Sequence, residues 1–475
     1  MRDQYQVPAV RKGMADISTA HVHLIGIGGA GLSAIARVLL EQGTGVSGSD
    51  LVISPVAEML VRDGALVYQG HDANHVNGAD VVVASSAIPD ENVEIREAEA
   101  RGIPVLRRPA FLRRMMEGKR VVAVAGTHGK TTTTAMIATV LVAAERDPTF
   151  IVGGVLADLE TNARAGSGPL FLIEADEYDR TFLSMTPYAA VITNVEHDHP
   201  DCYPTFEVFR RAFESFASLV PEEGLLAVCG DDPVAREIGQ SFADGASVRV
   251  FGLQDGLPWR AEEVRPNFAG GVDFLAVREG ETLGLVRLRV PGRHNASNAM
   301  AALVVADFLG IPFSVARQAL TSFRGVARRF EVKGEAEGVV VVDDYAHHPT
   351  EIRATLQAAR ERFPDRRIWA VWQPHTYSRT RELMDEFALA FEDADRVIVL
   401  PIYAAREKDT LGVSAADAAA LMNHPHVEAV SSLRAAVERL LHSVGDEDVV
   451  LTLGAGDGDS VGEWLLSELQ GRPDV

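Results

Sequence analysis

Hydrophobic positions in this chain form short apolar runs that alternate with stretches of helical spacing. The run His21–Ile25 predicts a strand, and Leu32–Leu40 repeats its apolar residues at the period of a helix. Further strands are expected around Val46, at Val81–Ala84 and at Ile103–Leu106. Strands that alternate with helices in this way predict an α/β unit with a parallel sheet.

A predicted helical joint at Pro109–Lys119 ends this first unit, and the alternation of strands and helices restarts at Arg120. It restarts a second time near Arg328. The middle stretch predicts strands Val121–Ala125, Leu170–Ile173, Ala189–Ile192, Val248–Phe251, Val272–Val277 and Leu285–Val290, and helices Thr131–Ala144, Phe206–Leu219, Ala296–Phe308 and Ser314–Ser322. The last stretch predicts strands Val339–Val342, Ile368–Trp372, Val397–Leu400 and Val449–Leu453, helices Pro349–Glu361, Arg379–Phe391, Ala415–Met422 and Leu433–Leu441, and a final helix.

Length agrees with this division, because 475 residues suggest about three domains of about 100–200 residues each. We therefore expect an α/β protein with domains at 1–119, 120–327 and 328–475. The first and third are predicted to be Rossmann-like, and the central one to be a P-loop ATPase-like α/β domain.

Composition places the chain among ordinary globular proteins, with 47% hydrophobic and 24% charged residues. The most apolar stretch, Ala135–Ala144, is about half of the roughly 18 residues that a membrane-spanning helix needs. The leader Met1–Ala20 lacks the apolar block of a secretory signal. Cys202 and Cys229 are too few for a disulfide framework. These features predict a cytoplasmic protein without membrane insertion.

The net charge bears on which molecules the protein can bind. The chain has 45 basic and 67 acidic residues, which give a formal charge of −22. Such a surface repels a phosphate backbone, so we expect no nucleic-acid partner. An anionic small substrate would need a local pocket of cationic groups, a metal ion or a helix N-terminus.

A first glycine-rich turn, Gly26-Ile-Gly28-Gly29-Ala-Gly31, lies between a predicted strand and helix, and Asp50 follows 24 residues after Gly26. Glycines in this context allow backbone N–H groups to approach a diphosphate at the helix N-terminus. NAD, FAD and a uridine diphosphate sugar all carry two linked phosphates, so the ligand stays open. In a purely structural alternative, the glycines only let the helix pack on its sheet.

A second turn, Gly126-Thr127-His128-Gly129-Lys130-Thr131, follows a buried strand and opens a helix. Its N–H groups can surround a triphosphate, Lys130 can neutralise the phosphates, and the Thr131 hydroxyl can bind Mg²⁺. The spacing departs from the full phosphate loop, since Val124 stands at the first glycine position. The alternative makes Lys130 a surface residue at a helix start. The pattern favours ATP binding, which weakens a dehydrogenase interpretation.

Several further blocks, taken in order, resemble the Mur ligases of peptidoglycan synthesis. Besides the two turns, the resemblance rests on Ser47-Gly-Ser-Asp50, Glu174-Ala-Asp-Glu177, Thr193-Asn-Val-Glu-His-Asp-His199, Pro291-Gly-Arg-His-Asn295, Asn298, Arg328-Arg-Phe330, Asp343-Asp-Tyr-Ala-His-His-Pro-Thr350, Gln373-Pro-His-Thr-Tyr-Ser-Arg-Thr-Arg381 and Gly454-Ala-Gly-Asp457. It covers nearly the whole chain, from His23 to Gly456. Ala30, Leu32, Ala34 and Tyr178 depart from the residues most common in the family, which bears on fine specificity.

The resemblance implies an ATP-dependent amide ligase. ATP would phosphorylate the lactyl carboxylate of UDP-N-acetylmuramate, and the amine of L-alanine would then displace phosphate. Activation is chemically required, because a carboxylate is a poor electrophile at neutral pH.

The resemblance also implies roles for individual residues in binding ATP and Mg²⁺ or Mn²⁺. Thr131 and Glu174 match a first metal site, and His199 matches a second; the chemistry of histidine leaves an orienting hydrogen-bond role for His199 open. The implied catalytic residues are Lys130, His199, Arg329, His375 and Arg379. The implied ATP-binding residues are Gly126, Thr127, His128, Gly129, Lys130, Thr131, Thr132, Asn295, Asn298, Arg329 and Asp344.

The two other substrates are assigned in the same way. The implied amino-acid-binding residues are Tyr345, His347, His348, His375, Arg379 and Arg381. The implied sugar-nucleotide residues are Gly26, Gly28, Gly29, Gly31, Asp50, Ser85 and Ser86. Two structural alternatives stay open, in which Asn295 caps a helix and the pair His347 and His348 forms a turn and a helix cap.

Rival functions also stay open at this point. A recycling ligase would join a preformed peptide, L-alanyl-γ-D-glutamyl-meso-diaminopimelate, to the same sugar nucleotide. A nicotinamide-dependent oxidoreductase would use only the first turn, and a nucleotide sensor would bind without turnover. We expect a monomer or a weak homodimer.

Overall fold

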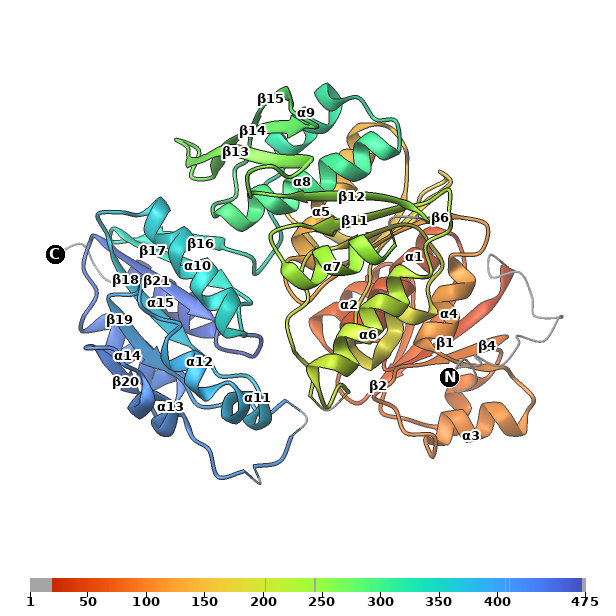
Figure 1. Ribbon diagram of the computed structural model, residues 1–475. Helices are drawn as coiled ribbons and strands as arrows, with labels where there is room; N and C mark the ends of the chain where they lie inside the picture. Colours follow the sequence, from red (N-terminus) through yellow and green to blue (C-terminus); the bar gives the residue numbers. More distant parts are fainter. Residues whose placement is uncertain (1–18, 201, 243–244, 406, 410, 472–475) are drawn as a thin grey trace.

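The computed structural model describes residues 19–200, 202–242, 245–405, 407–409 and 411–471, which form three sheets flanked by helices (Figure 1). The three-domain α/β architecture predicted from the pattern is thereby confirmed. Most of the leader, residues 1–18, lies outside the described residues. None of the described helices is long and apolar enough to cross a bilayer.

The first sheet has five parallel strands in the order β3-β2-β1-β4-β5. Chain order reverses beside β1, so the glycine turn that follows it opens at the crevice where such sheets bind ligands. The elements are β1 (His21–Ile25), α1 (Ala30–Glu41), β2 (Gly45–Asp50), α2 (Pro55–Arg62), β3 (Leu66–Gln69), η2 (Ala73–Val76), β4 (Val81–Ala84), α3 (Val93–Ala100), β5 (Val105–Arg107) and α4 (Arg108–Met115).

The middle sheet has ten strands in the order β15-β14-β13-β12-β11-β10-β6-β9-β7-β8. Its central strands are parallel, and antiparallel strands extend both edges. The elements are β6 (Arg120–Ala125), α5 (Lys130–Ala143), β7 (Thr149–Leu156), β8 (Thr161–Arg164), β9 (Leu170–Glu174), η3 (Tyr178–Ser184), β10 (Pro187–Ile192), α6 (Phe206–Ala217), β11 (Leu225–Cys229), α7 (Pro233–Ser241), β12 (Ser247–Gly252), β13 (Trp259–Pro266), β14 (Val272–Arg278), β15 (Glu281–Arg287), α8 (Arg293–Phe308) and α9 (Phe313–Ser322).

The third sheet has six strands in the order β16-β17-β21-β18-β19-β20, with only β16 antiparallel to its neighbour. The elements are β16 (Glu331–Ala336), β17 (Val339–Asp344), α10 (Pro349–Arg362), β18 (Arg367–Trp372), α11 (Tyr377–Glu382), α12 (Met384–Ala388), β19 (Arg396–Val399), α13 (Ala415–Leu421), β20 (Val427–Ala429), α14 (Leu433–Leu441), β21 (Asp448–Leu453) and α15 (Ser460–Gln470).

Two predicted elements differ most from the structure. The single helix predicted at Arg379–Phe391 is wrong, because α11 and α12 are separate short helices that meet at Leu383. The strand predicted at Leu285–Val290 begins earlier and ends at Arg287, since its register is set by antiparallel pairing with β14 across a tight turn.

Packing ties the first two sheets together. One hydrophobic cluster contains Val22 and Leu24 of β1, Phe111 and Leu112 of α4, and Val121 of β6. The third sheet is packed differently, with two clusters of its own on its two faces. Figure 1 shows this part (cyan to blue) set to one side of the other two. The joint Arg328–Phe330 has left-handed backbone at both ends, with φ of 59° at Arg328 and 49° at Phe330.

Candidate active site at the junction of the middle and C-terminal domains

The second glycine-rich turn follows the buried strand β6, and α5 begins at its Lys130. At Gly126, φ is +140° and an added Cβ would lie 1.9 Å from Thr193 Oγ1, so a side chain cannot fit there. The end of β10 holds the turn in place, because His128 N donates to Asn194 Oδ1 at 2.8 Å and Thr193 Oγ1 donates to His128 O at 2.6 Å. The turn is therefore a fixed cradle.

Lys130 folds back over this cradle. Its Nζ donates to Gly126 O at 2.6 Å and to Thr127 O at 3.0 Å, and it lies 2.9 Å from the Glu177 carboxylate. Burial by itself lowers the pKa of Lys130, but the neighbouring carboxylates, led by Glu177, raise it above its ordinary value. The alternative that made Lys130 a plain surface residue is wrong, and its positive charge is fixed within the turn.

Glu177 was missed by the sequence reasoning as a functional residue, although it ends the block that starts at Glu174. Its carboxylate also lies 3.5 Å from His199 Nε2, and its side chain is 2% exposed. Burial alone lowers the pKa of His199, while Glu177 and Asp198 raise it. His199 has a φ of 55°, so its ring is presented from a left-handed backbone. The structure thus joins Lys130, Glu177 and His199 in one buried charge network.

Thr131 and Glu174 lie beside this network. Thr131 Oγ1 donates to Glu174 Oε1 at 3.0 Å, and the other carboxylate oxygen accepts from Gly153 N at 2.7 Å. Burial raises the pKa of Glu174. The Thr131 hydroxyl in the first turn of α5 and the half-buried Glu174 carboxylate at the end of β9 are hard oxygen donors, which are the ligands that Mg²⁺ prefers. The donor set therefore fits the predicted ion.

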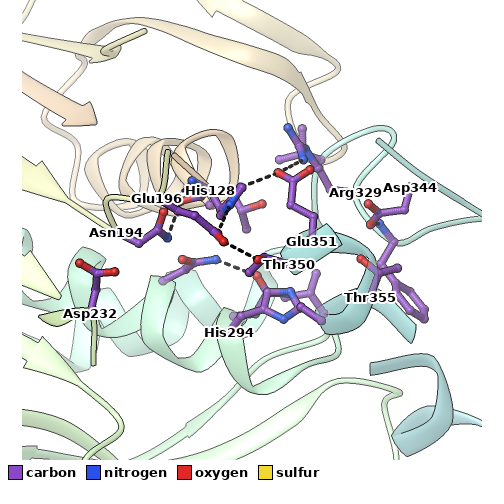
Figure 2. A pocket seen from close by; sticks show the side chains of 18 of the residues that line it. His128, Asn194, Glu196, Asp232, His294, Arg329, Asp344, Thr350, Glu351 and Thr355 are labelled. Atoms are coloured by element: carbon purple, nitrogen blue, oxygen red, sulfur yellow. Dashed lines mark hydrogen bonds and ion pairs between the residues drawn. The ribbon is translucent and has the colours of Figure 1, made fainter. Parts of the chain in front are cut away.

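A cavity of about 620 Å³ opens between the middle and C-terminal domains. Figure 2 shows side chains of both domains converging on it. Seven residues predicted to bind ATP line it, namely His128, Gly129, Thr132, Asn295, Asn298, Arg329 and Asp344. Residues far apart in the sequence therefore meet around one space large enough for a nucleotide.

Two carboxylates beside this cavity, Glu196 and Glu351, were not singled out from the sequence, and both contact His128. Its Nε2 lies 2.8 Å from Glu196 and its Nδ1 lies 3.2 Å from Glu351 of α10 (Figure 2). Thr350 Oγ1 donates to Glu196 at 2.9 Å. Burial alone lowers the pKa of His128, but the hydrogen bonds to Glu196 and Glu351 raise it to about 9. Glu196 lies within the Thr193–His199 block that resembles the family, and that block was its signal in the sequence.

Asn295 and Asn298 are inside helix α8. Asn295 Nδ2 donates to Pro291 O at 2.7 Å, and Asn298 Nδ2 donates to Asn295 Oδ1 at 3.1 Å. The alternative in which Asn295 caps the helix is wrong, because Gly292 occupies the N-cap position. A chain of amide hydrogen bonds thus fixes both side chains along the cavity wall.

Asp344 holds the joint between the two domains. Its carboxylate accepts from Phe330 N at 2.7 Å and from Ala346 N at 2.8 Å, and burial raises its pKa to about 6. Arg329 lies in the same joint, 3.9 Å from Glu351. Both residues therefore lie where the chain crosses from one domain to the other.

Most of the residues predicted to bind the amino acid form a chain of contacts. The rings of Tyr345 and His347 are 5.5 Å apart, and those of His347 and His375 are 5.8 Å apart. Arg379 lies 3.2 Å from His375 Nδ1 and donates to Asp198 Oδ1 at 2.9 Å, across the domain boundary. Burial, followed by the charge of Arg379, lowers the pKa of His375 to about 4, so this ring is neutral at pH 7.

The remaining two members of that predicted set lie apart from these contacts. His348 is the N-cap of α10, and its Nδ1 accepts from Thr350 N at 3.3 Å, as the helix-cap alternative predicted. Arg381 is exposed on α11. The structure thus separates His348 and Arg381 from the His347–His375–Arg379 cluster.

The first glycine turn lies in the first sheet, with Gly28 N donating to Asp50 Oδ2 at 2.9 Å. An added Cβ on Gly31 would lie 2.6 Å from the Arg108 guanidinium, which sequence reasoning had missed. Arg108 begins α4 and lies 3.9 Å from Asp176. A cation therefore stands beside the predicted diphosphate site.

The second predicted loop of that site lies next to the turn. An added Cβ on Gly26 would be 3.2 Å from Ser85 Cβ, and Arg107 NH1 donates to Ser85 O at 3.0 Å. Ser86 is exposed, and Gly29 is the N-cap of α1. The predicted sugar-nucleotide residues thus gather at the carboxyl ends of β1, β2 and β4.

Family models match the chain in three consecutive segments. Residues 21–120 match the Mur ligase family catalytic domain, residues 124–306 match the Mur ligase middle domain, and residues 328–456 match the Mur ligase glutamate ligase domain. The matches thus fall on all three sheets.

Individual relatives agree with these matches over nearly the whole chain. A UDP-N-acetylmuramate--L-alanine ligase from Roseiflexus sp. is 45% identical, with 95% of this chain and 99% of the relative covered. The crystal structure of the UDP-N-acetylmuramate-alanine ligase from Thermotoga maritima has a TM-score of 0.80 at 30% identity, covering 95% and 99% of the two chains. A murein peptide ligase from Psychrobacter arcticus has a TM-score of 0.69 at 26% identity, covering 96% and 100%. Because three Mur ligase models match in order and a relative is 45% identical over 95% of the chain, this chain belongs to the Mur ligase family.

Proposed function

We propose that the chain is an ATP-dependent ligase that joins L-alanine to the lactyl carboxylate of UDP-N-acetylmuramate. The observation that carries this proposal is similarity over nearly the full length of the chain to L-alanine ligases, one of which is 45% identical over 469 residues. The reaction forms a bond between the carboxylate oxygen and the γ-phosphorus of ATP and releases ADP. The alanine amine then attacks the acyl carbon, and phosphate leaves with that oxygen.

Phosphoryl transfer brings an anionic acceptor towards an anionic donor, so fixed positive charge has to offset the repulsion. Lys130 supplies such a charge, since three oxygen atoms hold its Nζ within the cradle. Mg²⁺ held by Thr131 and Glu174, with His199 nearby, would supply further neutralisation of the phosphates. Asn295, Asn298, Arg329 and Asp344 would position the nucleotide in the cavity that they line.

The second step needs an uncharged amine, because an ammonium group has no lone pair to attack with. His375 is neutral at pH 7 and lies beside Arg379. We assign Arg379 to the alanine carboxylate, as a guanidinium can hold it with two parallel hydrogen bonds. Because His375 Nδ1 faces an Arg379 donor, its neutral ring would hold the guanidinium in position, and the proton that the attacking amine releases would pass to solvent.

The first glycine turn and Arg108 would hold the diphosphate of the sugar nucleotide. The family assignment argues against the oxidoreductase alternative, in which Lys130 has no role in turnover. Because the substrates are ATP and a nucleotide sugar, we also propose that the reaction takes place in the cytoplasm. We propose a monomer or a weak homodimer as the oligomeric state.

The test is phosphate release from ATP with UDP-N-acetylmuramate in which both oxygens of the lactyl carboxylate are ¹⁸O. We expect release to depend on L-alanine, and one ¹⁸O atom to appear in each phosphate. A preference for L-alanyl-γ-D-glutamyl-meso-diaminopimelate over L-alanine would assign the chain to the recycling reaction instead. Phosphate without ¹⁸O would contradict the acyl-phosphate route. Lys130→Ala serves as the inactive control.

A further inference from the structure

A group of metal-ligating side chains lies across the domain boundary, apart from the predicted Mg²⁺ ligands. One ligand atom each from His128, Glu196 and His348 can be chosen so that all three lie within 4.8 Å of one another. His128 belongs to the cradle of the middle domain, Glu196 follows β10, and His348 precedes α10 of the C-terminal domain. Two imidazoles and one carboxylate form a ligand set typical of Zn²⁺ and related ions.

We propose that these three side chains form a binding site for a divalent transition-metal ion of the Zn²⁺ class, which would tie the cradle to α10. A solvent molecule from the adjoining cavity would complete a four-coordinate shell. The site is separate from the first metal site predicted at Thr131 and Glu174 and from the second predicted at His199, and it shares no ligand with either.

The surroundings of the three side chains carry the argument further, because they orient two of the ligands. Glu351 Oε1 lies 3.2 Å from His128 Nδ1, so that nitrogen donates to a carboxylate and Nε2 is left to face Glu196. Carboxylates that accept from the far nitrogen of a metal-binding histidine are a regular feature of zinc sites. Thr350 Oγ1 donates to Glu196 Oε1, which leaves Oε2 directed at His128.

Two of the three ligand pairs are close to the spacing that an ion needs, and the third pair lies within 4.8 Å. Glu196 Oε2 is 2.8 Å from His128 Nε2 and 3.8 Å from His348 Nδ1. Ligands at about 2.0–2.2 Å from one tetrahedral ion lie roughly 3.4 Å apart, between these two values. The ion would replace the proton shared by His128 and Glu196, and it would displace the 3.3 Å hydrogen bond from Thr350 N to His348.

The choice of metal follows from the donors. Mg²⁺ favours oxygen ligands and an octahedral shell, whereas imidazole nitrogen favours Zn²⁺, Ni²⁺ and Co²⁺. An excess of Mg²⁺ should therefore fill the oxygen site beside Thr131 without displacing Zn²⁺ from this one.

The experiment measures Zn²⁺ affinity of the tag-free full chain by competition with a chromogenic chelator, with Mg²⁺ in excess and without substrates. We expect one site, weakened more than about 100-fold in Glu196→Gln and His348→Gln and about 10–100-fold in Glu351→Gln. His442→Gln, which removes an exposed histidine, and His199→Gln should bind as the parent does.

Co²⁺ provides a second measurement on the unmodified chain, in case a variant fails to fold. A four-coordinate nitrogen and oxygen shell should give intense visible bands that Zn²⁺ removes. Binding lost in His199→Gln but retained in Glu196→Gln would place the ion at the other site and overturn the proposal. Complete displacement of Zn²⁺ by Mg²⁺ would overturn it as well. Neither result depends on ligase activity, so the proposed function is tested separately.

Discussion

Replacing Lys130 by Met should impair both the chemistry and the stability of the middle domain. The side chain is 14% exposed, and its partner Glu177 is 2% exposed. Met fills a similar volume but leaves the Glu177 carboxylate buried opposite an apolar group. The double variant Lys130→Met/Glu177→Gln removes both charges and so separates the two effects.

The expected loss of stability in Lys130→Met follows from the burial of Lys130 and Glu177. Removing one partner of a buried ion pair costs about 3–5 kcal/mol, because the other charge stays buried. His199 lies 3.5 Å from Glu177 and compensates part of the loss, so we expect the lower end, about 3 kcal/mol. A change of 1 kcal/mol shifts the melting temperature of a domain of 150–250 residues by about 2–4 °C. The first two domains share a core and form a larger unit than this range covers, so their transition should fall by about 5 °C.

Calorimetry and the phosphate-release assay measure the two effects on the same samples. We expect the double variant to recover at least half of the lost melting temperature while both variants stay about 10²–10³-fold slower than the parent. A single variant as stable as the parent, or a double variant less stable than the single one, would refute the assignment of a buried ion pair. Parental activity in either variant would refute the role of Lys130 in phosphoryl transfer.

Three further outcomes are expected. The pKa of His128 is raised to about 9, so its ion pairs should stabilise the protein fully below about pH 6.5, and this stabilisation should be lost as the pH rises through 9. Over that pH range, the melting temperature should fall less in His128→Gln than in the parent. Gly31→Ala places a Cβ 2.6 Å from the Arg108 guanidinium and should raise the KM for the sugar nucleotide about tenfold, with kcat nearly unchanged. Arg379→Lys loses the guanidinium fork and should lower kcat/KM for L-alanine about 10–100-fold at an unchanged KM for ATP, as steady-state kinetics would show.

Local patterns predicted the parallel strands well, because each is a short apolar run between polar loops. The strands Val81–Ala84 and His21–Ile25 were predicted at the residues where they occur. The helix predicted at Arg379–Phe391 failed for a different reason. Apolar spacing continues across Leu383, while the chain there bends between two short helices. Periodicity does not report such a bend.

The site was predictable only where chemistry concentrates in a motif. Lys130 and Thr131 stand out because glycine, lysine and threonine follow a buried strand. Glu351 lies outside every such motif, and Glu177 ends the Glu174–Glu177 block without a residue pattern that gives it a role, because single acidic residues are common on surfaces. These two residues matter because the fold brings Glu177 into an ion pair with Lys130 and Glu351 into contact with His128. No local sequence pattern encodes these long-range contacts.

The shared core of the first two sheets has a mechanical consequence. Since β1, α4 and β6 contribute to one apolar cluster, those two domains form a single rigid platform. The third lobe is joined to it through the backbone at Arg328–Phe330 and through polar contacts such as Arg379 with Asp198. A swing about that hinge would carry one wall of the proposed nucleotide pocket together with the residues proposed to bind the amine. Opening would then release products and disassemble the reaction centre in one movement.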